Sequence, residues 1–301
     1  MPRTPSQIQP QTTQPDRAGS GQQGRLFLVP PPAVDATPTR VGWSRRISRA
    51  ATGAAQEVIA SAAAVCRTPV RPADETVLGV TGHRQPLPLS LVRNQAEPPI
   101  VLVHGFAASR TCWFAVRRAL RADGRTVVSL DYSPWASSVD EVADRLVDTV
   151  EDLLAVTGAE KVHLVGHSLG GVIIAQALTR DRLAGRVDLV VTLGSPFGGT
   201  LWAGLLPVAP LVRALRPGSA LLRCLAAAPP PSGVRWLAFA STADPIVPAD
   251  RAVPANRDAT LVSIDGTGHS GMLLAPDVIE HIVAATKGAR RTAGRRHLVA
   301  A

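Results

Sequence analysis

Several features that would point to particular classes of protein are scarce in this chain of 301 residues. It has only three cysteines, Cys66, Cys112 and Cys224, which lie far apart without a CxxC spacing. Neither a zinc site nor a disulfide framework is therefore predicted. We expect buried free thiols, with a single disulfide as the alternative.

Long apolar segments are also missing. No uninterrupted apolar run reaches the ~18 residues of a membrane span. The first residues, Met-Pro-Arg-Thr-Pro-Ser-Gln, contain no apolar core of a secretory signal. The sequence thus predicts a cytoplasmic protein without a transmembrane segment, with secretion as the alternative if the assigned start codon is wrong.

The net charge of +9 does not indicate a nucleic-acid partner, because the positive charge is confined to the two ends. Residues 1–50 carry seven Arg and two Asp, and residues 287–301 carry one Lys and four Arg without an acidic residue. The rest of the chain holds 20 basic and 21 acidic residues. A nucleic-acid surface needs basic residues gathered on a folded face, so we expect no such partner.

Composition divides the chain into four parts. Residues 1–40 are rich in Pro, Gln, Thr and Gly, which predicts a disordered N-terminal extension. Residues 41–97 predict a helical and irregular segment, whose Ala-rich helix could pack on the main domain, contact a membrane surface or bind a partner. Residues 98–287 contain the regular patterns of the main domain, and residues 288–301 form a basic C-terminal tail. Oligomeric state is not predicted.

Short apolar runs rich in β-branched residues alternate with helical patterns from Pro99 onward. Such buried runs indicate parallel strands. They lie at 100–103, 126–130, 161–165, 187–193, 236–240 and 260–264. Helices are predicted after a capping box at Ser138–Glu141, over 170–180 and over 276–286. This alternation predicts an α/β fold, a mostly parallel sheet with helices on both faces.

The segment 201–232 interrupts this alternation. It is rich in Leu, Ala and Pro and contains no carboxylate. Such an insertion between two strands can cover a pocket, so it is a candidate cap or lid. A pair of ordinary packed helices is the alternative.

The segment Gly166-His167-Ser168-Leu169-Gly170 fits the pattern G-x-S-x-G between a predicted strand and a predicted helix. In this context the serine sits on a sharp turn that exposes its hydroxyl above the sheet. Small residues flank it because the turn is crowded. Ser168 is therefore predicted to be a nucleophile, and the alternative is a glycine-rich turn without function.

A serine nucleophile needs a base that is oriented by an acid, in the chain order Ser, Asp or Glu, His. Of the seven histidines, His269 lies in a glycine-rich loop after a strand and is the predicted base. Asp244 follows the preceding strand and is the predicted acid, with Asp265 as its rival.

The negatively charged oxygen of an acyl-transfer intermediate needs two amide donors. We predict the amides of Leu169, which follows the nucleophile, and of Phe106, with Ala107 as the alternative to Phe106. His104 is expected to order this loop.

Taken with His104-Gly105-Phe106 and the turn from Asp244 to Pro248, these motifs resemble the α/β-hydrolase superfamily over roughly residues 98–287. The segment 192–200, Thr-Leu-Gly-Ser-Pro-Phe-Gly-Gly-Thr, further resembles a segment of bacterial triacylglycerol lipases and lipase-like acylhydrolases. Together the motifs resemble a bacterial triacylglycerol lipase- or esterase-like serine hydrolase. The resemblance implies the α/β-hydrolase fold. It also implies hydrolysis of small-molecule acyl esters or lipids by a serine hydrolase, with peripheral membrane contact left open.

The resemblance does not carry over the structural calcium of some lipases, because no matching carboxylate pair is present. We expect no cofactor and no metal. The alternatives to a lipase or esterase are an acyltransferase or thioesterase with the same triad and, less favoured, a non-catalytic binding protein. The sequence does not predict the acyl chain length or the alcohol.

Overall fold

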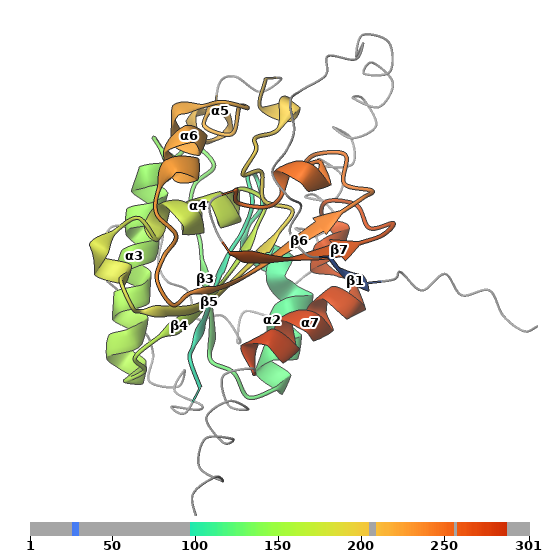
Figure 1. The fold of residues 1–301 in the computed structure, drawn as a ribbon. Helices are drawn as coiled ribbons and strands as arrows, with labels where there is room; N and C mark the ends of the chain where they lie inside the picture. The colour runs from blue at the N-terminus through green and yellow to red at the C-terminus, as the bar shows by residue number, and fades with distance from the viewer. Residues whose placement is uncertain (1–25, 30–96, 205–208, 256–257, 288–301) are drawn as a thin grey trace, which may run out of the picture.

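The computed structural model describes residues 26–29, 97–204, 209–255 and 258–287 (Figure 1). The predicted helical segment at 41–97 lies outside these residues except for its last position. The basic tail and Cys66 lie outside them entirely.

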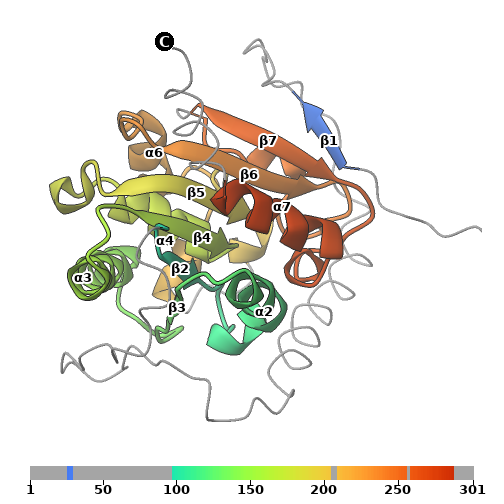
Figure 2. The ribbon, with the colours of Figure 1, turned by 90° about the horizontal axis from the view of Figure 1, so that it is seen from below.

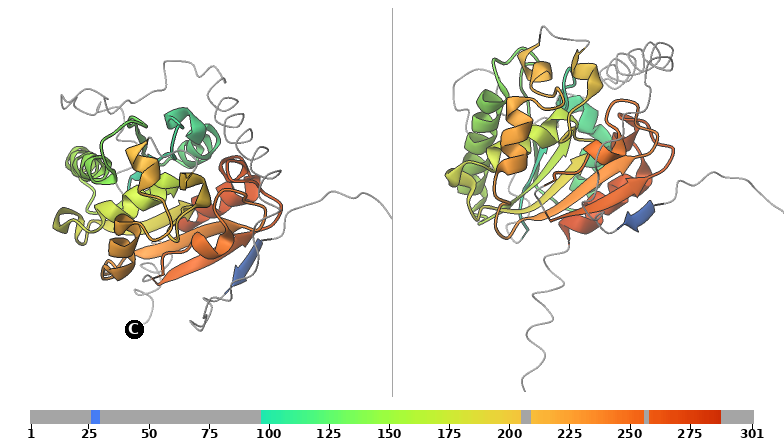
Figure 3. Two further views of the ribbon diagram at one scale, coloured as in Figure 1. Left: turned by 90° about the horizontal axis from the view of Figure 1, so that it is seen from above. Right: turned by 45° about the horizontal axis from the view of Figure 1, so that its top comes forward.

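A sheet of seven strands forms the centre of the described structure, in the order β1-β7-β6-β5-β4-β2-β3. Strands β2 to β7 are parallel, and β1 pairs antiparallel with β7 at the edge (Figure 3). The strands are β1 (Leu26–Val29), β2 (Ile100–Val103), β3 (Val127–Leu130), β4 (Val162–His167), β5 (Val187–Leu193), β6 (Arg235–Ser241) and β7 (Ala259–Ile264).

Helices cover both faces of the sheet, as Figure 2 shows. Helices α3 (Val139–Thr157) and α4 (Leu169–Ala177) pack on one face, and α2 (Phe114–Ala122) and α7 (Pro276–Thr286) pack on the other. Each face has its own apolar cluster, and strands β2, β4 and β5 are buried almost throughout. The predicted α/β architecture is therefore confirmed.

One α-helix and one strand of the described structure were not predicted. The sequence pattern did not predict helix α2, because three arginines interrupt its apolar stripe. Two residues of that stripe, Val116 and Leu120, are fully buried. Strand β1 lies inside the segment predicted to be disordered, so that prediction is wrong for these four residues. Leu-Phe-Leu-Val is a short apolar run, but the composition of residues 1–40 taken as a whole is polar, so the prediction of disorder included it.

Helix α3 begins and ends as its sequence predicts. The Ser138 hydroxyl accepts a hydrogen bond from the Glu141 amide at 3.1 Å, and Gly158 ends the helix in the left-handed conformation with φ 68°. The Glu141 carboxylate bonds the amide and hydroxyl of Ser137 rather than the amide of Ser138, which the capping box predicts. The hydrogen bonds of the Glu141 carboxylate are thus shifted by one residue toward the N-terminus relative to a capping box.

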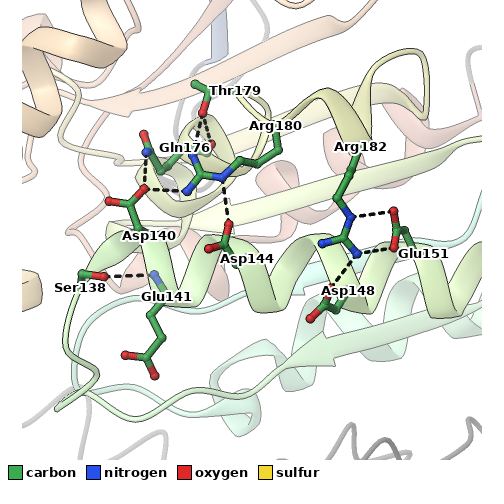
Figure 4. A network of polar contacts seen from close by, with 10 residues as sticks. All are labelled: Ser138, Asp140, Glu141, Asp144, Asp148, Glu151, Gln176, Thr179, Arg180 and Arg182. Atoms are coloured by element: carbon green, nitrogen blue, oxygen red, sulfur yellow. Dashed lines mark hydrogen bonds and ion pairs between the residues drawn. The ribbon is translucent and has the colours of Figure 1, made fainter.

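A polar network ties α3 to the helix that follows Ser168 (Figure 4). Arg180, just beyond α4, donates to Asp140 at 2.6 Å and to Asp144 at 2.8 Å. Arg182 pairs with Asp148 and Glu151 one turn further along α3. These partly exposed pairs keep α4 aligned with α3 at the surface, while the apolar contacts beneath them supply most of the stability.

The candidate lid contains η5 (Leu201–Gly204), α5 (Pro210–Arg213) and α6 (Ala220–Ala227), above α4 in the view of Figure 1. Its residues Leu211, Leu215, Leu222 and Leu225 are buried and belong to the same apolar cluster as α3 and α4. In the described state, α5 and α6 are therefore packed helices, and their opening stays a prediction.

Two further expectations concern cysteines and membrane spans. Cys112 is buried as predicted, whereas Cys224 is exposed on α6. The expectation of burial was wrong for Cys224 because α6 turns only one side toward the core. Within the described ranges, no helix combines the length and apolarity that crossing a membrane requires.

Candidate active site

Ser168 occupies a strained turn between the end of β4 and the start of α4. Its backbone has φ 54° and ψ −125°, which is costly for a residue with a side chain. The Ser168 amide donates to the Leu193 carbonyl of β5 at 2.9 Å, so the neighbouring strand stabilises the turn. A serine held in this way at a strand-to-helix turn presents its hydroxyl at the carboxyl edge of the sheet.

The glycines around Ser168 allow this close packing. A Cβ on Gly170 would lie 2.0 Å from the Val103 carbonyl oxygen, and one on Gly166 would lie 2.6 Å from the Gly171 nitrogen. Both neighbours are backbone atoms that cannot rotate away. The turn can therefore approach β2 and α4 only without side chains at these positions, which explains the G-x-S-x-G pattern.

Asp244 and His269 form a buried pair at the same edge of the sheet. His269 Nδ1 donates to Asp244 Oδ2 at 2.7 Å, and both side chains are buried. Asp244 Oδ1 accepts two further bonds, from the amides of Ile246 and Val247 at 2.8 and 2.9 Å. These bonds fix the carboxylate, and the carboxylate fixes the tautomer and orientation of the imidazole.

The rival acid, Asp265, does not reach this pair. It is exposed, and its Oδ1 accepts from the Thr242 hydroxyl at 3.1 Å. Asp244 is therefore the carboxylate that bonds His269.

Gly194 links the Asp244–His269 pair to Ser168. A Cβ on Gly194 would lie 3.0 Å from Asp244 Oδ2 and 3.2 Å from His269 Nδ1. The residue before it, Leu193, accepts the Ser168 amide. The three predicted triad residues, from the ends of β4, β6 and β7, thus surround the end of β5.

The loop after β2 also lies against Ser168. A Cβ on Gly105 would lie 3.0 Å from the Ser168 Cβ. The backbone of the next residue, Phe106, therefore starts close to Ser168. Ala107 has φ 55°, an uncommon conformation for a non-glycine residue. Leu169 follows Ser168 directly as the first, buried residue of α4. The two amides predicted as oxyanion donors therefore belong to two segments that both adjoin Ser168.

Tyr132 supports this loop, which the sequence did not indicate. Its hydroxyl donates to the His104 carbonyl at 2.7 Å, and its ring stacks on the His104 imidazole at a centroid distance of 4.2 Å. His104 Nδ1 is 2.9 Å from the Gly105 carbonyl, and Nε2 is 3.4 Å from Asp131. The contact with His104 lowers the pKa of Asp131. The loop is thus held by a buried aromatic residue and an adjacent carboxylate.

A second residue of the site that the sequence did not indicate is His167, the residue before Ser168. It is buried, and its Nε2 lies 3.1 Å from the His269 carbonyl oxygen.

No group of three or more His, Cys, Asp or Glu side chains suited to holding a metal ion occurs in the part of the chain that the structure describes.

The order of the strands, the strained turn at Ser168 and the chain order Ser168, Asp244, His269 are together typical of one class of fold. Comparison with known proteins points to the same class. Residues 98–222 match the family described as alpha/beta hydrolase fold. The chain has the α/β-hydrolase fold, and the proteins that it resembles in sequence include a lipase and an esterase. It is 37% identical over 132 residues to a triacylglycerol lipase of Vibrio cholerae serotype O1, covering 42% of this chain and 39% of the lipase. It is 35% identical over 115 residues to the probable esterase PIR7A of Oryza sativa, covering 34% and 43%.

The chain thus spans about two fifths of these relatives' length. Solved structures extend the likeness of the fold. The mature lipase BlEst2 of Bacillus licheniformis superposes with a TM-score of 0.54 at 19% identity, over 63% of this chain and 93% of that one. Aspergillus fumigatus lipase B superposes with a TM-score of 0.56 at 17% identity, over 73% and 62%.

Proposed function

We propose that this protein hydrolyses carboxylic esters through an acyl-enzyme on Ser168. The observation that carries the proposal is the buried Asp244–His269 hydrogen bond beside the strained Ser168 turn. A buried carboxylate that orients an imidazole at the same edge of the sheet as a serine is the arrangement that activates a serine nucleophile. The sequence similarity to a lipase and to an esterase supports an ester as the substrate.

In the proposed reaction, His269 takes the hydroxyl proton as Ser168 attacks the ester carbonyl. Asp244 stabilises the imidazolium that forms, and the amides of Phe106 and Leu169 donate to the negatively charged carbonyl oxygen. His269 then gives the proton to the leaving alcohol. Water, deprotonated by the same histidine, attacks the acyl-enzyme and releases the acid.

Exposed apolar side chains around this edge favour lipid-like esters. Among the described residues, the large apolar side chains that are exposed are Phe114, Trp135, Leu201 and Leu274, at 45% to 68% exposure. Each lies in a connection that leaves the carboxyl end of a strand, namely β2, β3, β5 and β7. Because those ends share one edge with Ser168, an acyl chain that enters the site meets apolar surface.

A series of p-nitrophenyl esters from acetate to palmitate tests the proposal. Wild type should hydrolyse them, with kcat/KM rising with chain length, and a fluorophosphonate probe should label Ser168 covalently. Ser168→Ala should lose roughly 10⁶-fold in kcat and all labelling. Ser270→Ala, which changes a nearby loop hydroxyl instead, should keep both. Equal turnover by wild type and Ser168→Ala would refute the acyl-enzyme.

A further inference from the structure

His167 is a buried side chain at this edge that takes no part in the proposed reaction. It ends β4, one residue before Ser168, and is 5% exposed. Its Nε2 lies 3.1 Å from the backbone oxygen of His269, which is 102 residues further along the chain. A carbonyl oxygen can only accept, so Nε2 carries the proton and donates it.

The other ring nitrogen of His167 is enclosed. Within the described ranges, Nδ1 is buried and has no hydrogen-bond partner, and a Cβ on Gly105 would lie 3.2 Å from it. Burial, together with the nearby His269, lowers the pKa of His167 to about 3. The ring therefore stays neutral when His269, at a centroid distance of 4.7 Å, takes up a proton. It can hold the base without competing for that proton.

The loop that carries His269 needs such an anchor. Gly266, Gly268 and Gly271 lie within three residues of His269, and Gly266 has φ 69°. The Asp244 bond holds the imidazole, and the Ser241 hydroxyl donates to the Thr267 carbonyl two residues earlier, but neither of these bonds involves the backbone of His269 itself. A second bond at the carbonyl of the same residue fixes that backbone relative to β4, which also carries the nucleophile.

We infer that His167 is a positioning residue that anchors the backbone of His269 to the strand bearing Ser168. The inference rests on the proposed function, because it assigns His269 the role of base. A displacement of the base by about 1 Å can cost about 10²-fold in rate. A side chain that only fills space would have no such effect, so the donor atom of His167 is the part to test.

Gln and Met make a matched pair at position 167, because they have the same length and only Gln keeps a donor near the position of Nε2. His167→Met should lower kcat about 10- to 100-fold with little change in KM, whereas His167→Gln should keep most of the activity. In a His269→Ala background, His167→Met should cause no further loss, because its effect passes through the base. Equal losses for Met and Gln, or a further loss in that background, would show a packing role and overturn the inference.

The ring signals of His167 in a nitrogen NMR spectrum test the bond without turnover. Wild-type His167 should show the Nε2–H form and no titration between pH 5 and 8, the range in which an unperturbed histidine changes charge. An Nδ1–H form, or a titration in that range, would overturn the anchor. Failure of the proposed function would look different: the Nε2–H form would be present, but wild type would be no more active than Ser168→Ala.

Discussion

Replacing Asp244 with asparagine tests the proposed catalytic arrangement most sharply, because the structure determines how the new amide must lie. Asp244 Oδ1 accepts from the amides of Ile246 and Val247 at 2.8 and 2.9 Å. Turning the asparagine NH2 toward these donors would leave them unsatisfied, at a cost of about 1–3 kcal/mol each. The asparagine oxygen therefore stays on their side.

The NH2 group of the introduced asparagine must then face His269 Nδ1, which the wild-type carboxylate contacts at 2.7 Å. An amide N–H donates, so Nδ1 becomes the acceptor and the ring proton moves to Nε2. In that tautomer His269 cannot accept the Ser168 proton. We expect a loss of roughly 10⁴-fold in kcat, or about 5 kcal/mol of transition-state stabilisation, with KM little changed.

Steady-state hydrolysis of p-nitrophenyl butyrate measures this loss, and thermal unfolding shows that the variant folds. Asp265→Asn is the matched control, since that exposed carboxylate bonds only the Thr242 hydroxyl among the described residues. It should retain activity within about twofold, as surface substitutions leave most properties unchanged. Nearly full activity in Asp244→Asn, or a large loss in Asp265→Asn, would refute the proposed role of Asp244.

Three further predictions concern stability. Gly170→Ala should lower the free energy of unfolding in urea by about 3 kcal/mol or prevent folding, because its Cβ would lie 2.0 Å from the Val103 oxygen. Gly204→Ala is the control and should leave the free energy of unfolding nearly unchanged, because no atom lies within 4 Å of its Cβ. Burial lowers the pKa of His163 to about 4, below its unfolded value of 6.5, so its neutral form contributes stability that is present above pH 6.5 and is lost as the pH falls toward 4. That contribution is at most about 3 kcal/mol. His163→Gln should therefore flatten the fall of the urea midpoint between pH 7.5 and 4.5. An unchanged dependence of the midpoint on pH would contradict the lowered pKa of His163. Arg180→Ala should cost less than ~1 kcal/mol, because its pairs with Asp140 and Asp144 are partly exposed, and the difference from wild type should shrink in 0.5 M salt; a larger, salt-independent loss would point to packing instead.

The elements that could be predicted are those whose pattern is local and uninterrupted. The buried strands β2 and β5 are β-branched apolar runs, and α3 has both its cap at Ser138 and its stop at Gly158. Helix α2 was missed because an arginine-rich segment looks polar until a neighbour such as α7 covers its apolar side. Strand β1 was missed because four residues form a strand only when an edge such as β7 is available for pairing.

By itself the sequence determined the fold class and the position of Ser168 on a strand-to-helix turn, because the spacing of glycines around such a turn is a local requirement of the backbone. The order of strand ends also indicated Asp244 and His269. Only the tertiary structure decided between Asp244 and Asp265, since the choice depends on which carboxylate is buried against the imidazole. It alone brought His167 to the His269 carbonyl and Tyr132 to the His104 carbonyl. Such contacts join residues from different strands, and no periodicity along the chain records which strand ends become neighbours.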